Sequence, residues 1–93
     1  MTPKVIRHQG TYVAIAMPLP KSMAKDRFCV NEWKSCYGEE TEAGKILNEA
    51  KNCNAHITDV CIFWPKAEFH FKMYFQSKSS AEYFIQAIAE FIE

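Results

Sequence analysis

Four cysteines and three histidines in this 93-residue chain have side chains that could bind a metal or act in nucleophilic catalysis. Structural zinc usually needs two cysteines separated by about two to four residues. The cysteines here lie seven and eight positions apart within their pairs, so we expect neither a zinc site nor a disulfide, and instead reduced thiols that pack as small hydrophobic residues. The residues concerned are Cys29, Cys36, Cys53, Cys61, His8, His56 and His70.

The sequence contains no recognisable catalytic motif. Its three glycines are isolated, so there is no glycine-rich phosphate loop, and neither G-x-S-x-G nor H-E-x-x-H occurs. Cys61 would need His56 or His70 across a sheet as its base, but strict strand alternation puts Cys61 on the face of Ile57 and Asp59, and His56 on the other. We therefore expect a protein without enzymatic activity, cofactor or small-molecule substrate.

The spacing of hydrophobic residues predicts two β-hairpins. Residues 4–8 and 11–17 flank Gly10, whose backbone freedom suits a tight turn. Residues 55–64 and 67–76 flank a turn at Pro65-Lys66. The last strand alternates regularly, so one of its faces should pack on a core and the other should meet water or a partner. The predicted core-facing residues are Ala67, Phe69, Phe71, Met73 and Phe75.

Helical spacing predicts the remaining elements. Residues 23–37 carry apolar residues at helical intervals, and a second helix should begin in the acidic stretch 39–42 and end near Asn52 and Asn54. Ser79-x-x-Glu82 reads as a capping box that opens the last helix. The order ββ-α(α)-ββ-α predicts a single α+β domain, 1–93, with a four-stranded antiparallel sheet and helices packed on one face. The second helix should face this core with Ile46 and Leu47, and the last with Phe84 and Ile88.

Charge is balanced overall but unevenly distributed. Eleven basic and eleven acidic residues give a formal net charge of zero, yet residues 1–34 carry +4 and residues 35–93 carry −4. A basic region can attract a nucleic-acid backbone or an acidic protein groove, although an ordinary solvated surface is the alternative. The candidate partner-binding residues are the six cations of the first segment, Lys4, Arg7, Lys21, Lys25, Arg27 and Lys34.

The polar face of the last strand is a second candidate surface. His70, Lys72 and Tyr74, with Trp64 and Tyr12 nearby, combine aromatic rings with cations, a mixture that can stack bases or form a protein hot spot. The alternative is that Trp64 and Tyr12 simply pack against the sheet edge or a loop. No apolar run approaches about 18 residues and no secretion signal is evident, so we expect a cytoplasmic protein without a membrane partner.

Two resemblances bear on function. Residues 72–85, KMYFQSKSSAEYFI, resemble the third strand and following helix of RNA-recognition-motif domains, whose outward aromatic residues stack on bases. The matching positions here are His70 and Lys72, neither of which is aromatic, and the glycine of that motif is missing.

The whole chain, from MTPKVIRHQG to AIAEFIE, resembles small phage anti-CRISPR proteins that inhibit type I-F surveillance complexes. This resemblance rests on no motif. It implies a stoichiometric, non-enzymatic inhibitor, without cofactor, that binds a CRISPR RNA–protein surveillance complex in the host bacterial cytoplasm and blocks pairing with target DNA. The alternative is a single-stranded nucleic-acid-binding domain with an open sheet face.

Overall fold

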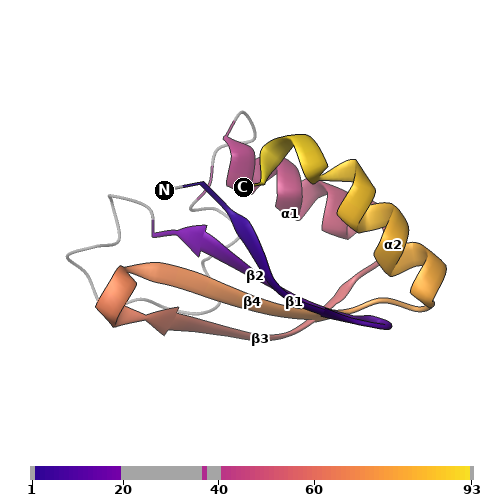
Figure 1. Ribbon diagram of the computed structural model, residues 1–93, viewed down its shortest axis with the longest axis horizontal. Helices are drawn as coiled ribbons and strands as arrows, with labels where there is room; N and C mark the ends of the chain where they lie inside the picture. Colours follow the sequence, from indigo (N-terminus) through magenta and orange to yellow (C-terminus); the bar gives the residue numbers. More distant parts are fainter. Residues whose placement is uncertain (1, 20–36, 38–40, 93) are drawn as a thin grey trace.

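The computed structural model describes residues 2–19, 37 and 41–92. Within these residues the strands form one antiparallel sheet in the order β1-β2-β4-β3, and α1 and α2 lie together on one side of it (Figure 1). This arrangement confirms the predicted α+β class and the four-stranded sheet. The helix predicted over 23–37 lies outside the described residues. The elements are β1 (Lys4–Gln9), β2 (Tyr12–Pro18), α1 (Glu42–Asn52), β3 (His56–Phe63), η3 (Trp64–Lys66), β4 (Glu68–Tyr74), α2 (Lys78–Ala87) and η4 (Ala89–Phe91).

Both predicted hairpins are present, and they join through their inner strands. In the first turn Gly10 has a φ of +59°, a left-handed conformation that costs glycine little. In the second, η3 reverses the chain at Pro65 before β4 begins. β2 then pairs with β4, so that residues from the two ends of the described chain meet at the centre of the sheet.

The hydrophobic core lies between the sheet and the two helices. In β4 the alternation predicts the buried side correctly, because Phe69, Phe71 and Met73 are all fully buried. The prediction that Ala67 also faces the core is wrong, because Ala67 precedes β4 in the turn, has a φ of +49° and is exposed. They form one cluster with the buried stripes of α1 and α2, represented by Ile46 and Phe84. Ile88 also belongs to this cluster, and Leu47 packs against it half-buried, as predicted. The opposite face of the sheet is therefore not covered by α1 or α2 (Figure 1).

A β-bulge in β3 overturns the strict alternation expected for this strand. Ile57 lies opposite Met73, whereas Asp59 lies opposite Lys72, so the register shifts between them. Thr58 is the extra residue, and its hydroxyl donates a hydrogen bond to the Lys72 carbonyl oxygen at 3.3 Å. The prediction that Ile57 shares a face with Cys61, and that His56 does not, is therefore wrong. Ile57 faces the core, and His56 and Cys61 both lie on the other face.

Helix α1 begins and ends with local hydrogen bonds that the sequence specifies. The Thr41 hydroxyl accepts a hydrogen bond from the Gly44 backbone N–H at 3.0 Å, which satisfies one of the unpaired amides of the first turn. Glu42 is the acidic residue of that turn. After Asn52 the chain leaves the helix, and Asn54 adopts a φ of +56°, so the predicted stop at the two asparagines is confirmed.

The N-cap of α2 differs from the predicted capping box. The cap is Ser77, which has extended backbone angles and accepts a hydrogen bond from the Ser80 backbone N–H at 3.1 Å. Ser79 already lies inside the helix, where its helical backbone prevents it from acting as the N-cap. The prediction of Ser79 and Glu82 as a capping box is therefore wrong by two residues.

Ser77→Ala should lower the free energy of unfolding by about 1 kcal/mol, because the N-terminal amides of α2 lose their side-chain acceptor. Urea unfolding followed by circular dichroism measures the change. Ser79→Ala is the matched control and should change the free energy of unfolding by less than about 0.5 kcal/mol. Equal losses in the two variants would contradict the assignment of Ser77 as the cap.

Candidate functional site

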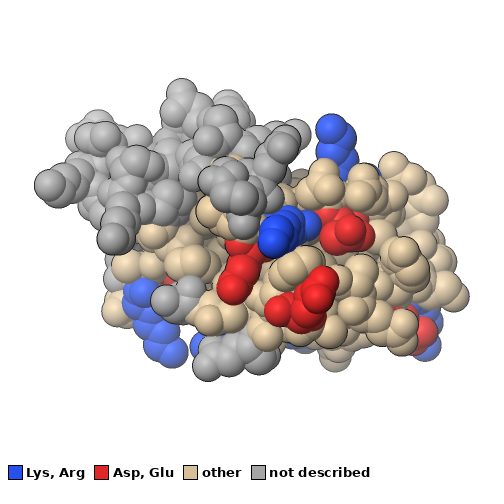
Figure 2. All heavy atoms as spheres, turned by 90° about the horizontal axis from the view of Figure 1, so that it is seen from above, with Lys and Arg blue, Asp and Glu red and all other residues tan. Residues whose placement is uncertain are grey.

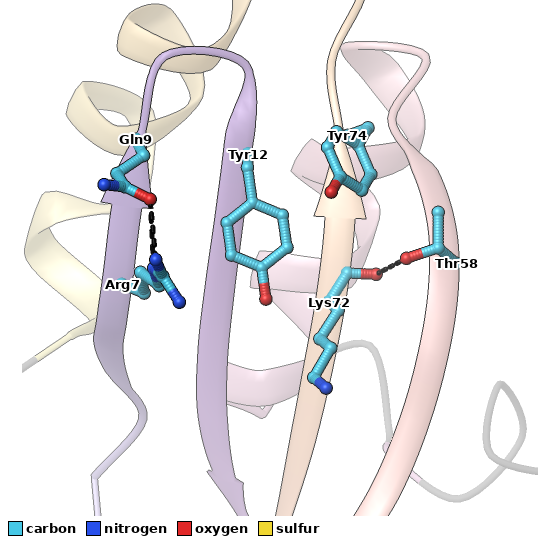
Figure 3. A pocket seen from close by; sticks show the side chains of 6 residues that line it. All are labelled: Arg7, Gln9, Tyr12, Thr58, Lys72 and Tyr74. Atoms are coloured by element: carbon cyan, nitrogen blue, oxygen red, sulfur yellow. Dashed lines mark hydrogen bonds between the residues drawn. The ribbon is translucent and has the colours of Figure 1, made fainter.

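The sheet face opposite the helices carries a shallow hollow of about 410 Å³ that is open to solvent. Side chains from all four strands meet there, because alternate residues of each strand point away from the core (Figure 3). We call this surface the open face. The hollow is lined by Arg7, Gln9, Tyr12, Thr58, Lys72 and Tyr74.

Two tyrosines form the centre of the hollow. Tyr12 and Tyr74 lie opposite each other on β2 and β4, and their ring centroids are 5.0 Å apart at an interplanar angle of 54°. Tyr74 is 46% exposed, so much of its ring surface meets solvent. Tilted aromatic pairs of this kind stabilise each other and still present a ring face to a ligand. The pair can therefore act as a stacking platform for a flat ring.

Arg7 reaches the open face because β1 also contains an irregularity. Val5 lies opposite Ile15 of the core, whereas Arg7 lies opposite Ala14, and the register shifts between them. The guanidinium carbon of Arg7 lies 5.9 Å from the Tyr12 ring centroid, within the range of a cation–π contact. Its Nε and Nη2 atoms donate hydrogen bonds to Gln9 Oε1 at 3.1 and 2.8 Å, which orients the guanidinium beside the hollow (Figure 3).

Lys72 is the second cation of the hollow. Its Nζ lies 3.7 Å from Asp59 Oδ2, and the side chains of the two residues are 45% and 56% exposed. An exposed ion pair at this distance contributes little free energy, because water and salt screen both charges. Lys72 can therefore exchange Asp59 for an incoming anion such as a phosphate.

A second aromatic contact lies at the other end of β4. The rings of Phe63 and His70 are stacked, with centroids 5.3 Å apart and an interplanar angle of 22°. His70 Nε2 lies 3.0 Å from Glu68 Oε1, and the Glu68 side chain is 5% exposed. This hydrogen bond fixes the imidazole on the open face. Exposed Cys61 lies opposite His70 on β3.

The structure brings together part of each predicted surface. Tyr12, Lys72 and Tyr74, chosen as the polar sheet face, line one hollow, and Arg7 joins them from the predicted basic segment. Lys4 lies opposite Ala16 on the same side of β1. The other four predicted cations, Lys21, Lys25, Arg27 and Lys34, lie outside the described residues, as does the side chain of Trp64. Gln9 and Thr58 also line the hollow but were not predicted from the sequence. Thr58 could not be predicted from strand alternation, because alternation does not show where a bulge interrupts the strand.

The helix side of the molecule has a different charge pattern. Seen from above in Figure 2, acidic and basic side chains are mixed there among uncharged ones. The helices contribute Lys45 and Lys51 together with Glu42 and Glu49 in α1, so no excess of positive charge arises. In the hollow on the open face, by contrast, the charged lining residues are Arg7 and Lys72. Among the described surfaces, the hollow is therefore better suited to an anion than the helix side, whereas Asp59 and Glu68 lie elsewhere on the open face.

Three further features of residues 2–19, 37 and 41–92 bear on function: potential metal ligands, thiols and the length of the helices. No three His, Cys, Asp or Glu side chains in these ranges gather as a metal-binding group. Cys53 and Cys61 are free thiols, and burial, followed by the nearby Glu49 carboxylate, raises the pKa of the Cys53 thiol. No helix in the described part of the chain is long and apolar enough to cross a membrane.

Comparison with known proteins found no family model, no curated protein and no solved structure that matches this chain significantly. The chemistry of the open face is therefore the basis for a function.

Proposed function

We propose that the protein binds single-stranded nucleic acid through its open face. The observation that carries this proposal is the juxtaposition of two tyrosine rings with Arg7 and Lys72 in one solvent-open hollow. Aromatic side chains stack on bases irrespective of sequence, and cations beside them bind the phosphates of the same strand. An open sheet surface suits unpaired bases because their ring faces are accessible, whereas those of a duplex are stacked on one another.

The charge balance of the chain also favours this form of binding. With a formal net charge of zero, the protein has no general attraction for the dense charge of a duplex. Binding must then depend on local contacts, in which stacking on Tyr12 and Tyr74 supplies much of the affinity and the two cations position the backbone. No catalytic step is part of this proposal.

The test is the salt dependence of oligonucleotide binding. Fluorescence anisotropy should show binding to a labelled single strand and at least tenfold weaker binding to the corresponding duplex. Arg7→Gln with Lys72→Gln should reduce the slope of log K against log salt by about 0.7 for each lost phosphate contact. Lys51→Gln with Lys78→Gln, two cations of the helices, is the control and should leave the slope unchanged. Equal slopes in both double variants would contradict the proposal.

Inhibition of a type I-F CRISPR RNA–protein surveillance complex, implied by the whole-chain resemblance, is a second proposal. The observation that supports it is the position of Arg7 and Lys4, two of the nominated cations, on the open face, where they can meet guide-RNA phosphates or protein beside them. An inhibitor of this kind would act non-enzymatically in the cytoplasm of the host cell. It should copurify with the complex and bind free RNA weakly, the reverse of the first proposal.

A further inference from the structure

The open face carries two aromatic pairs at separate places along β4. Tyr74 belongs to the first pair, with Tyr12, and His70 belongs to the second, with Phe63. Lys72 lies between them in the sequence, and its side chain is on the same face because β4 alternates regularly. We call the pair Tyr12–Tyr74 the first platform and the pair Phe63–His70 the second platform.

The two platforms are so far apart that a single base, or two neighbouring stacked bases, cannot contact both of them at once. Tyr74 and His70 are four residues apart on one strand, which corresponds to about 13 Å at the usual rise per residue. Neighbouring stacked bases are separated by only about 3.4 Å along a strand. A ligand that uses both platforms must therefore be a strand whose bases are drawn apart along β4.

The second platform has the properties of a stacking site. Its two rings are nearly parallel, and Phe63 is 40% exposed although it is a large apolar residue. The hydrogen bond to Glu68 holds the imidazole in place, so little side-chain freedom remains to be lost on binding. The phosphate that connects the two platforms is placed at Lys72 and not beside Glu68, because a carboxylate that is only 5% exposed is screened less by water than a surface carboxylate.

We propose that the ligand is an extended single strand of at least three nucleotides that lies along β4, with one base on each platform and a phosphate at Lys72. This inference rests on the proposed function and adds the length and the path of the strand. Lys72 is suited to the connecting phosphate because it lies between the platforms and its ion pair with Asp59 is exposed to solvent.

The first experiment measures affinity against ligand length. Unlabelled oligothymidylates of one to six nucleotides compete with a labelled hexamer, and the dissociation constant should fall at least tenfold between two and four nucleotides. Phe63→Ala should remove most of that gain and leave dinucleotide binding within twofold of the unchanged protein. His70→Gln, which keeps a hydrogen-bonding partner for Glu68, should also reduce the gain in affinity between two and four nucleotides. Tyr83→Ala, an exposed tyrosine of α2, is the matched control.

The second experiment uses Cys61 as a reporter of the strand's path. Cys61 is exposed and lies opposite His70, at the second platform. A saturating tetranucleotide should slow its alkylation by iodoacetamide at least fivefold, followed by peptide mass spectrometry, whereas saturating thymidine monophosphate should not. Half-buried Cys53, at the end of α1, is the internal reference and should react at the same rate in all samples.

The outcomes separate the proposed binding of single-stranded nucleic acid from the proposed path of the strand over both platforms. If no oligonucleotide of any length binds, the proposed function itself is wrong. If the tyrosine-dependent binding is observed but is equally tight for two and six nucleotides, and Cys61 stays unprotected, the function stands and the two-platform path is wrong.

Discussion

Replacing Tyr12 and Tyr74 together by alanine should weaken the binding of single-stranded oligonucleotides about ten- to a hundredfold. Stacking of a base on an aromatic side chain is worth about 1–3 kcal/mol, and each 1.4 kcal/mol corresponds to about a factor of ten in affinity. The double variant removes both rings of the first platform. Its loss should exceed that of any change to a single cation. Fluorescence anisotropy at fixed salt measures the effect.

The controls for this variant separate ring stacking from folding and from the hydroxyl groups. Tyr12→Phe with Tyr74→Phe keeps both rings and should bind within about threefold of the unchanged protein. Circular dichroism and urea unfolding must show that each variant is folded. A folded double-alanine variant that binds within twofold of the original would contradict the assignment of the open face as the binding site.

Phe71→Ala should lower the free energy of unfolding by about 3–5 kcal/mol. Phe71 is fully buried at the centre of the sheet, where it lies opposite Ile15 on one side and Val60 on the other. It also makes an edge-on ring contact with Phe69, at a centroid distance of 5.7 Å. Removal of the ring leaves a cavity that its neighbours cannot fill. Since small domains are stable by about 5–15 kcal/mol, this loss removes a large share of the stability of the protein.

The matched control for Phe71 is a phenylalanine on the other side of the sheet. Phe63 is 40% exposed on the open face, so Phe63→Ala should cost less than about 1 kcal/mol in urea unfolding. A loss below about 1 kcal/mol in Phe71→Ala would mean that the faces of the sheet are assigned the wrong way round. Equal losses in the two variants would contradict the contrast between a buried Phe71 and an exposed Phe63.

The fold class could be predicted because the information that specifies it is local. In β4 each apolar residue is followed by a polar or exposed one, so the buried side of Phe69, Phe71 and Met73 follows from the period of a strand. The end of α1 follows in the same way from Asn52 and Asn54, which favour a stop. Neither prediction requires knowledge of which strands are neighbours.

The errors and omissions arise where tertiary packing decides. In β3 the pairing with β4 places Ile57 opposite Met73 on the core side and Asp59 opposite Lys72 on the other side. Thr58 is therefore left over as a bulge, which the sequence of β3 alone does not reveal. Arg7 reaches Tyr12 through a similar shift in β1, and the separation of the two residues in the sequence gives no hint of it. At α2, Ser77 and Ser79 are chemically equivalent caps, and only the place where β4 ends decides between them.

The central pairing of β2 with β4 also determines when the open face can exist. Tyr12 belongs to the beginning of the chain and Tyr74 to the last strand, and they become neighbours only when these two strands pair. Pairing of such distant segments must first overcome the entropy of closing a long loop, and sheets with this connectivity fold more slowly than helical proteins of local contacts. The first platform therefore cannot form in either hairpin alone. A nascent chain on the ribosome cannot present it until β4 has been synthesised and released from the exit tunnel.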